Sequence, residues 1–220
     1  PGKRVYVRRV EFRGNTFSKD EVLRREMRQF EGAWFSQAAV DRSKLRLQRI
    51  GYFENVNIET PAVEGSDDQI DIIVSVEERS TGSFQVGLGF SQLQGLIASI
   101  SIQQQNFLGS GRTIGLGISR SSITSSVNLN YTNPYFTDDG VSLGYFINYS
   151  EFNQGRANIS RFSTSQVALG ANLGFPITEI DFIRLGASVR RQDINIGQLV
   201  AVPEDPDDPN SPTRLDRKST

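Results

Sequence analysis

Four acidic residues near the C-terminal end form the densest group of side chains capable of chemistry. Glu204, Asp205, Asp207 and Asp208 are interleaved with prolines. Carboxylates are the ligands that Ca²⁺ prefers, but this spacing is not that of an EF-hand, and prolines disfavour a calcium cage. We therefore interpret the stretch as a solvated surface loop without a metal. Its prolines are Pro203, Pro206, Pro209 and Pro212.

The rest of the composition argues against an enzyme. The 220 residues include no histidine and no cysteine, which excludes Ser-His and Cys-His nucleophilic machinery, His-ligated zinc and thiolate metal sites. No paired-carboxylate motif is visible, and we expect no cofactor. The formal net charge is −1, so the chain lacks the positive charge that nucleic-acid binding requires.

Charge is distributed unevenly along the chain. Residues 1–80 carry 14 Lys and Arg and 14 Asp and Glu, whereas residues 81–152 carry only five charged residues. Glycine, serine, asparagine and aromatic residues replace them. We therefore predict one domain over residues 1–80 and a second over residues 81–220, which ends in the acidic, proline-rich loop.

The first part shows the pattern of a small α+β domain. Val5–Phe12 alternates as a strand. Ser18–Glu21 has the pattern of a capping box, which predicts a helix that stops near Gly32. A second helix is predicted from about Ser36 to Ile50, and two strands follow around Phe53–Ile58 and Ile70–Val76. The predicted order is β-α-α-β-β.

The second part repeats apolar residues with period two. About seven strands are predicted, each long enough to cross a bilayer when tilted. They centre on Phe84–Phe90, Leu96–Ile102, Ile114–Ile118, Val127–Tyr131, Val141–Tyr149, Val167–Phe175 and Ile183–Val189. A soluble sandwich and a membrane barrel both produce this alternation.

Two features favour an antiparallel transmembrane β-barrel segment. The polar positions are Gly, Ser, Asn, Gln and Thr rather than Lys and Glu, as suits a hydrated lumen. Alternate connections are short and aromatic, as expected at a membrane interface, while the others are longer or more polar. The predicted interfacial aromatics are Phe107, Tyr131, Tyr135, Phe136 and Phe175, for which packing within the barrel or its turns is the alternative.

Several motifs resemble the BamA family, whose members combine POTRA (polypeptide-transport-associated) domains with a surface-antigen barrel. The stretch LRREMRQFEGAW at 23–34 and RIGYFE at 49–54 resemble the last POTRA domain. ERSTGSF at 78–84 is similar to the start of the first barrel strand. NFLG at 106–109, NPYF at 133–136 and GFPI at 174–177 resemble three periplasmic turns.

The resemblance implies a piece of a longer protein, with the last POTRA domain and about seven strands of a larger barrel. It implies assembly and insertion of β-barrel proteins into the bacterial outer membrane, with the POTRA domain in the periplasm. The implied partners are outer-membrane lipid, periplasmic lipoproteins of the assembly complex and unfolded client proteins. The main alternative is a two-partner-type secretion transporter; an outer-membrane enzyme or an inert porin fits less well.

The first barrel strand is the first candidate site by this resemblance. In the family it forms a lateral gate where a client strand pairs by backbone hydrogen bonds. The glycines of this strand have an alternative role, which is to relieve crowding inside a barrel. The candidate gate residues are Gly82, Ser83, Phe84, Gln85, Val86, Gly87, Leu88, Gly89 and Phe90.

A charged helix end is the second candidate. By resemblance, Glu31 together with Arg24, Arg25 and Arg28 docks a periplasmic lipoprotein. Charged patches of this kind suit specificity and transient docking more than affinity. Without the resemblance, the same residues are typical of a solvated helix face.

Overall fold

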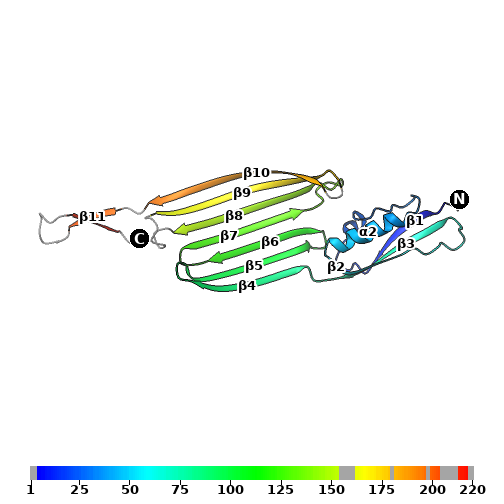
Figure 1. Ribbon diagram of the computed structural model, residues 1–220, viewed down its shortest axis with the longest axis horizontal. Coiled ribbons are helices and arrows are strands. Elements are labelled where there is room, and N and C mark those ends of the chain that lie inside the picture. Colours follow the sequence, from blue (N-terminus) through cyan, green and yellow to red (C-terminus); the bar gives the residue numbers. More distant parts are fainter. Residues whose placement is uncertain (1–3, 154–161, 179–180, 197–198, 204–212, 218–220) are drawn as a thin grey trace.

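The computed structural model describes residues 4–153, 162–178, 181–196, 199–203 and 213–217. An N-terminal α+β domain lies against one end of a long antiparallel sheet (Figure 1). The turns around residues 107–112 and 133–142 lie at the end of the sheet nearest this domain. No helix in the described part is long and apolar enough to cross a membrane, and the described residues contain no cluster of three or more Asp, Glu, His or Cys residues that could hold a metal ion.

The N-terminal domain has the predicted order of elements. β1 covers Tyr6–Arg13, α1 Asp20–Arg24, α2 Gln37–Arg49, β2 Phe53–Glu59 and β3 Gln69–Glu78. The sheet order is β1-β3-β2, with β1 parallel and β2 antiparallel to β3. β3 is therefore the central strand, and its C-terminal end leads directly toward the large sheet.

The core of this domain lies between the three-stranded sheet and the helices. Val7 and Val10 are both buried although they are three residues apart, because the register between β1 and β3 shifts between Val7 and Arg9. Such a bulge changes which side chains point inward, so the simple alternation predicted for this strand is interrupted. The remaining members of this core cluster are Val22, Leu23, Met27, Val40, Leu47, Tyr52, Phe53, Val56, Ile72, Val74 and Val76.

The first helix is shorter than predicted, and the predicted capping box is wrong. α1 has five residues, and its N-cap is Lys19, with no side-chain capping hydrogen bond. The Ser18 hydroxyl instead accepts a hydrogen bond from Asn106, 88 residues further along the chain. The loop after α1 is held by Gln29, which donates to the Trp34 carbonyl and accepts from the Ser36 amide. Tertiary hydrogen bonds thus replace the expected local ones.

The second part is a seven-stranded antiparallel meander in the order β10-β9-β8-β7-β6-β5-β4, which confirms the predicted barrel segment. Each strand pairs with its neighbours in sequence, so the two outer strands of the sheet are β4 and β10 (Figure 1). The strands are β4 Gly82–Ser91, β5 Gly95–Phe107, β6 Arg112–Arg120, β7 Thr124–Asn133, β8 Ser142–Asn153, β9 Phe162–Pro176 and β10 Phe182–Ile196.

A short hairpin that the sequence did not predict follows the sheet. β11 at Leu199–Pro203 pairs with β12 at Thr213–Arg217. The acidic residues Glu204, Asp205, Asp207 and Asp208, interpreted above as a surface loop, lie outside the described residues.

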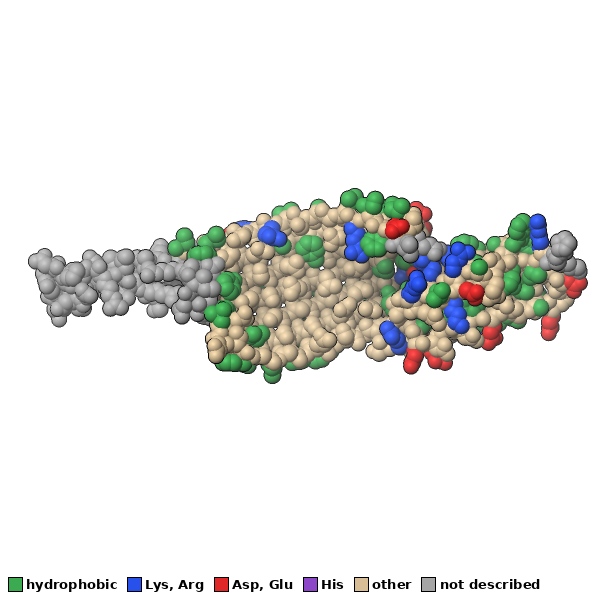
Figure 2. All heavy atoms as spheres, in the orientation of Figure 1, with side chains coloured by type: hydrophobic (Ala, Val, Ile, Leu, Met, Phe, Trp, Pro, Cys, Tyr) green, Lys and Arg blue, Asp and Glu red, His purple; other side chains and the backbone are tan. Residues whose placement is uncertain are grey.

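The two faces of the large sheet differ in chemistry. In an antiparallel pair, directly opposed residues share one face, so the registers define rows that cross all seven strands. One row is Phe84, Ile102, Leu116, Leu129, Ile147, Leu169 and Val189; a row of the opposite face is Gln85, Ser101, Gly117, Asn128, Asn148, Ala168 and Arg190. Figure 2 shows mainly neutral polar side chains and backbone over the broad surface of the sheet.

The apolar face has no covering layer in the described part of the chain. Phe84 is 64% exposed, Leu129 40% and Val189 77%. In a soluble sandwich these side chains would pack against a second sheet. The exposure of a whole apolar face is typical of a surface that meets lipid, as the sequence predicted.

Candidate functional site: the β4 edge and its junction with the N-terminal domain

Strand β4 contains all nine candidate gate residues and lies at an edge of the large sheet. Among the described strands it pairs only with β5, in an unbroken register from Gly82 opposite Gln104 to Ser91 opposite Gly95. Just before the strand, the Gln105 amide donates to the Thr81 carbonyl. Hydrogen-bonded pairs alternate along an antiparallel ladder, so odd-numbered residues of β4 bond to β5.

The even-numbered residues therefore direct their backbone groups to the open edge. These residues are Gly82, Phe84, Val86, Leu88 and Phe90. From Phe84 to Phe90 their side chains are 60–79% exposed on the apolar face. A row of free N–H and C=O groups is a template for another strand.

The glycines of β4 have more than one role. A Cβ at Gly87 would lie 2.5 Å from the Ser99 Oγ, whereas a Cβ at Gly89 would meet nothing within 4 Å. Gly115 likewise makes room for Asn130, and Gly170 for Phe146. Gly87 thus resembles the glycines of later strands that relieve crowding, while Gly89 leaves the polar face open beside the edge.

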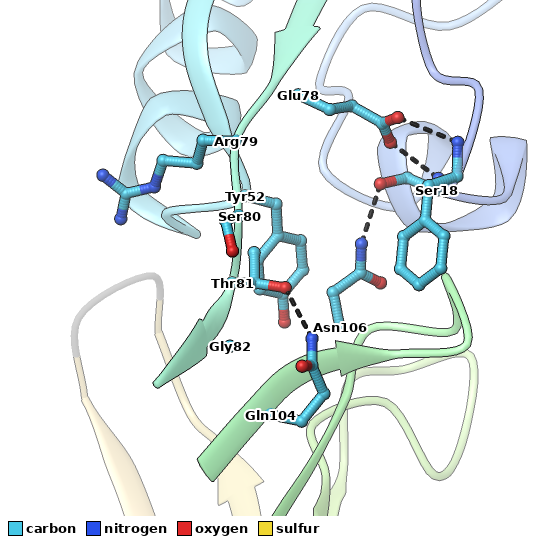
Figure 3. Close-up of a pocket in the computed structure, with 10 residues that line it drawn as sticks. Ser18, Tyr52, Glu78, Arg79, Ser80, Thr81, Gly82, Gln104 and Asn106 are labelled. Atoms are coloured by element: carbon cyan, nitrogen blue, oxygen red, sulfur yellow. Dashed lines mark hydrogen bonds between the residues drawn. The ribbon is translucent and has the colours of Figure 1, made fainter. Parts of the chain in front are cut away.

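The connection from β3 to β4 is held from both sides. The Arg79 amide donates to the Tyr52 carbonyl, and its side chain to the Gly51 carbonyl. On the other side, the Thr81 hydroxyl donates to the Gln105 carbonyl at 2.7 Å and accepts from Gln104 at 2.9 Å. Beside this connection, a cavity of about 280 Å³ is lined by residues of both parts (Figure 3).

A chain of hydrogen bonds joins the end of β3 to the first turn of the large sheet (Figure 3). The Glu78 carboxylate accepts from the Phe17 amide at 2.8 Å, the Ser18 amide at 2.6 Å and the Thr16 hydroxyl at 3.0 Å. Ser18 accepts from Asn106 Nδ2 at 2.7 Å, and Asn106 Oδ1 accepts from the Gly111 amide at 2.8 Å. Partial burial favours the neutral acid, but the donated hydrogen bonds outweigh it and lower the pKa of Glu78.

The turn between β5 and β6 packs its backbone against the backbone of the N-terminal domain. The Lys19 amide donates to the Gly109 carbonyl at 2.9 Å, and a Cβ at Gly109 would lie 2.0 Å from the Phe17 carbonyl oxygen. Asn106 and Leu108 adopt left-handed φ values of 50° and 52°, which non-glycine residues adopt only when their surroundings stabilise them. The buried Tyr52 hydroxyl, which donates to the Gly111 carbonyl at 3.0 Å, contributes to this stabilisation.

The turn between β7 and β8 places Tyr135 between charged residues of the N-terminal domain. Its hydroxyl accepts from Arg46 at 3.0 Å, and Arg25 stacks over its ring at 4.3 Å. The buried Glu26 pairs with Arg46 at 2.8 Å. Burial, with the Glu26 charge, raises the pKa of Tyr135, so its hydroxyl stays neutral near neutral pH.

Of the five interfacial aromatics predicted from sequence, Tyr135 differs from the other four because it contacts the N-terminal domain. Tyr135 packs against the N-terminal domain, because its turn faces that domain rather than the bulk interface. Phe136 is 56% exposed, and Phe107 is 37% exposed. Tyr131 stacks on Tyr145 on the apolar face, where the half-buried Phe175 also lies opposite Ile183.

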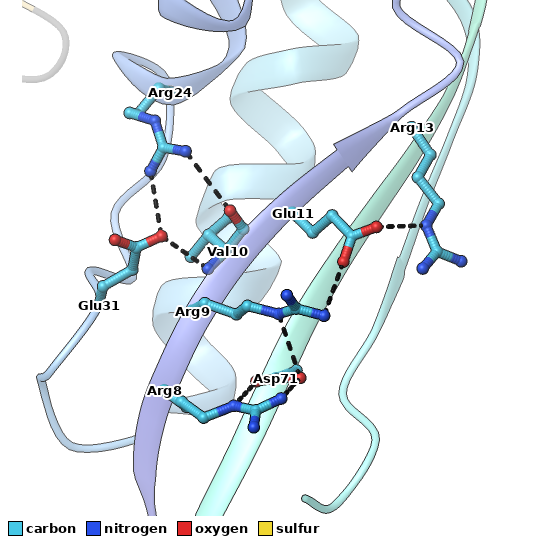
Figure 4. Close-up of polar contacts among 8 residues, drawn as sticks. All are labelled: Arg8, Arg9, Val10, Glu11, Arg13, Arg24, Glu31 and Asp71. Carbon is cyan, nitrogen blue, oxygen red and sulfur yellow. Dashed lines mark hydrogen bonds and ion pairs between the residues drawn. The ribbon is translucent and has the colours of Figure 1, made fainter.

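The predicted docking group is divided in the same way. Glu31 Oε1 accepts from the Val10 amide at 2.8 Å and from Arg24 at 3.2 Å (Figure 4). The Val10 hydrogen bond is the main reason that the pKa of Glu31 is lowered. Arg25 faces Tyr135, and Arg28 lines a cavity beside it. The structure brings Arg24 and Glu31 together but places Arg25 and Arg28 toward the sheet.

Both parts of the chain match known families. Residues 5–79 match the POTRA model, described as a surface antigen variable number repeat, and residues 106–204 match the Omp85 superfamily domain. The chain belongs to the Omp85 superfamily. The N-terminal domain is accordingly a POTRA domain, and the meander is a segment of an Omp85 barrel.

Named relatives and solved structures agree with this family. The chain is 37% identical to the outer membrane protein assembly factor BamA of Neisseria meningitidis, over 89% of this chain and 25% of that protein. It is 31% identical to BamA of Buchnera aphidicola, over 88% of this chain and 31% of that protein. The chain thus spans about a quarter to a third of these curated relatives.

The structural comparison extends over nearly the whole chain. The crystal structure of Haemophilus ducreyi BamA lacking POTRA domains 1–3 matches with a TM-score of 0.76 and 40% identity, covering 99% of this chain and 42% of that one. CdiB from Acinetobacter baumannii matches with a TM-score of 0.61 and 14% identity, covering 87% and 39%. The latter likeness shows the fold alone.

The residues that join the POTRA domain to the barrel segment were missed from sequence. Glu78, Ser18, Asn106 and Tyr52 belong to four separate segments, and their shared role depends on tertiary contact. The NFLG turn carried a usable signal, because asparagine and glycine are each favoured in turns. The POTRA residues that contact this turn, Ser18 and Tyr52, carried no such signal in the sequence.

We predict that Gly109→Ala weakens the junction more than Gly95→Ala. Gly109 and Gly95 have positive φ values of +69° and +66°. The backbone strain of an alanine in this left-handed region costs about 1 kcal/mol at either position. At Gly109 the methyl group would also collide with the Phe17 carbonyl, so we expect a total cost of about 3 kcal/mol. Urea unfolding and limited proteolysis at residues 78–82 measure the difference; equal effects of both variants would contradict the packing role.

The lowered pKa of Glu78 predicts an acid-dependent junction. A carboxyl group whose pKa falls on folding stabilises the folded state above its unfolded pKa of about 4.3 and loses this contribution as pH falls through the folded value. Glu78→Gln should therefore be less stable than wild type at pH 7, with the difference shrinking below about pH 4.3. Glu77→Gln is the matched control, and a pH-independent difference for Glu78→Gln would argue against ionised hydrogen bonding.

Proposed function

We propose that this chain is the POTRA-to-barrel portion of an outer-membrane protein assembly factor. Residues 1–80 lie in the periplasm, and residues 81–220 begin the barrel in the bacterial outer membrane. The support is the tandem POTRA and Omp85 matches, the relatives named BamA and the exposed apolar face of the sheet. The proposed partners are outer-membrane lipid, unfolded β-barrel clients and periplasmic lipoproteins of the assembly complex.

The tandem POTRA and Omp85 matches carry this function, and the edge of β4 that faces away from β5 is the lateral gate in this proposal. Inside a bilayer, each unpaired backbone group costs several kcal/mol, so an incoming strand is strongly favoured to pair there. The even-numbered residues supply the donors and acceptors, and the apolar side chains beside them keep the site in lipid. Insertion proceeds by exchange of hydrogen bonds, with no covalent step and no cofactor.

Lipoprotein docking centres on Glu31 and Arg24 in this proposal. Glu31 Oε1 is engaged by Val10 and Arg24, whereas Oε2 has no hydrogen-bond partner among the described residues. The two hydrogen bonds to Oε1 fix the orientation of the carboxylate, so Oε2 is positioned to accept a hydrogen bond from a partner. Arg25 and Arg28 support the POTRA–barrel junction instead.

A two-partner-type transporter is the weaker alternative. Such a protein would pass clients through its pore and would not depend on the β4 edge. The relatives with 31–40% identity are all named as BamA, which favours assembly.

Proline substitution tests the edge directly. Val86→Pro removes an N–H that points to the open edge, so we expect the sheet to remain stable while client insertion falls at least about tenfold. Val86→Ala keeps the N–H and should insert clients normally. The measurement is the rate of client folding into vesicles by the full-length protein that carries this chain.

A companion variant separates an edge effect from a folding defect. Gln85→Pro removes an N–H that bonds to β5, so it should lower the stability of the sheet itself. If Val86→Pro inserts clients as fast as Val86→Ala, β4 is an ordinary barrel strand.

The proposed membrane placement predicts that neighbouring residues on the two faces of the sheet tolerate an introduced charge differently. Leu129→Arg puts a charge on the apolar face, where it should cost about 2–4 kcal/mol near the bilayer midplane. Asn128→Arg puts the same charge on the polar face and should cost less than about 1 kcal/mol. Urea unfolding in lipid vesicles measures both, and equal costs would rule out lipid contact at this face.

A further inference from the structure

A polar cavity lies where the POTRA domain meets the ends of β6 and β7. It has a volume of about 390 Å³. The POTRA side contributes Glu21, Arg24 and Arg25; the barrel side contributes Arg112, Asn133 and Asp138. The proposed gate does not reach this cavity, and the proposed lipoprotein docking surface shares only Arg24 with it.

The cavity lies at the end of the apolar face rather than inside the barrel. Side chains alternate along a strand, so Arg112 shares the face of Ile114 and Leu116, and Asn133 shares that of Tyr131 and Leu129. The cavity therefore begins where the lipid-facing rows end. Headgroups of the periplasmic leaflet occupy this level when the rows lie in hydrocarbon.

The charged groups in the cavity are incompletely paired. Arg112 forms no hydrogen bond or ion pair with another described residue, and the Nε of Arg25 is buried without a partner in the described part of the chain. Arg24 is engaged by Glu31, and the only ion pair of Glu21 with a described residue is that with Lys19, at 3.9 Å. Asp138 likewise has no polar partner among the residues described. Arginines and carboxylates thus face one cavity without neutralising one another.

We propose that this cavity binds the zwitterionic headgroup of a phospholipid. Arg112 and Arg25 contact the phosphodiester, for which guanidinium groups are well suited. Asp138 and Glu21 accept hydrogen bonds from a primary ammonium, which distinguishes an ethanolamine headgroup from a choline headgroup. The inference rests on the proposed membrane placement of the sheet, and it assigns a lipid contact that also bridges the POTRA domain and the barrel.

Lipid binding to the full-length protein that carries this chain tests the site. Native mass spectrometry in detergent would titrate dilauroyl phosphatidylethanolamine, the matching phosphatidylcholine and inorganic phosphate. Arg112→Gln should weaken phosphatidylethanolamine binding about tenfold. Arg120→Gln is the matched control, because it lies on the same face of β6 at the opposite end and should change nothing.

Each outcome decides the proposal. Tighter binding of phosphatidylethanolamine than phosphatidylcholine, lost in Arg112→Gln alone, supports it. Equal weakening by Arg112→Gln and Arg120→Gln, unchanged binding in Arg112→Gln, or equal affinity for both lipids overturns it. Displacement of the lipid by inorganic phosphate at similar concentration would indicate a free-anion site instead. Client insertion, measured on the same preparations, shows separately whether the assembly function itself fails.

Discussion

The hydrogen-bond chain from Glu78 through Ser18 to Asn106 fixes where β4 begins. It joins the last residue of β3, the segment before α1 and the first turn of the large sheet. Ser18 and Asn106 are buried, so water does not replace these bonds, and each lost partner would leave a polar group unsatisfied at about 1–3 kcal/mol. The POTRA domain and the barrel segment are therefore joined by a specific structure rather than a flexible linker.

The β5–β6 turn and the β7–β8 turn contact the POTRA domain through different kinds of interaction. The first turn makes backbone contacts that leave no room for a side chain at Gly109. The second turn relies on Tyr135 among Arg25, Glu26 and Arg46, where charge and ring stacking dominate. The corner beside β4 is consequently the more tightly constrained, because close packing tolerates less displacement than charged contacts do.

The edge and the faces of the sheet serve separate requirements. Backbone direction, not side-chain identity, makes β4 a template, since the free N–H and C=O groups alternate with those bonded to β5. Side chains then decide the surroundings: the apolar rows suit lipid, and the polar rows suit water. Gly115 and Gly170 make room for larger neighbours on the polar face, which shows that glycine in this sheet is not by itself a sign of a gate.

The sequence by itself determined the order of elements, the seven strands and the two-faced sheet, because period and composition are local properties that survive any packing arrangement. Helix α2 followed from its pattern for the same reason. Tertiary structure decided the length of α1, the partner of Ser18 and the position of Tyr135 at the junction. These depend on contacts between residues 59 to 89 positions apart, and a hydrogen-bonding side chain takes whichever partner the fold brings near. Ser18 carried a valid local signal for a capping box, but burial beside Asn106 and Glu78 offered it stronger partners.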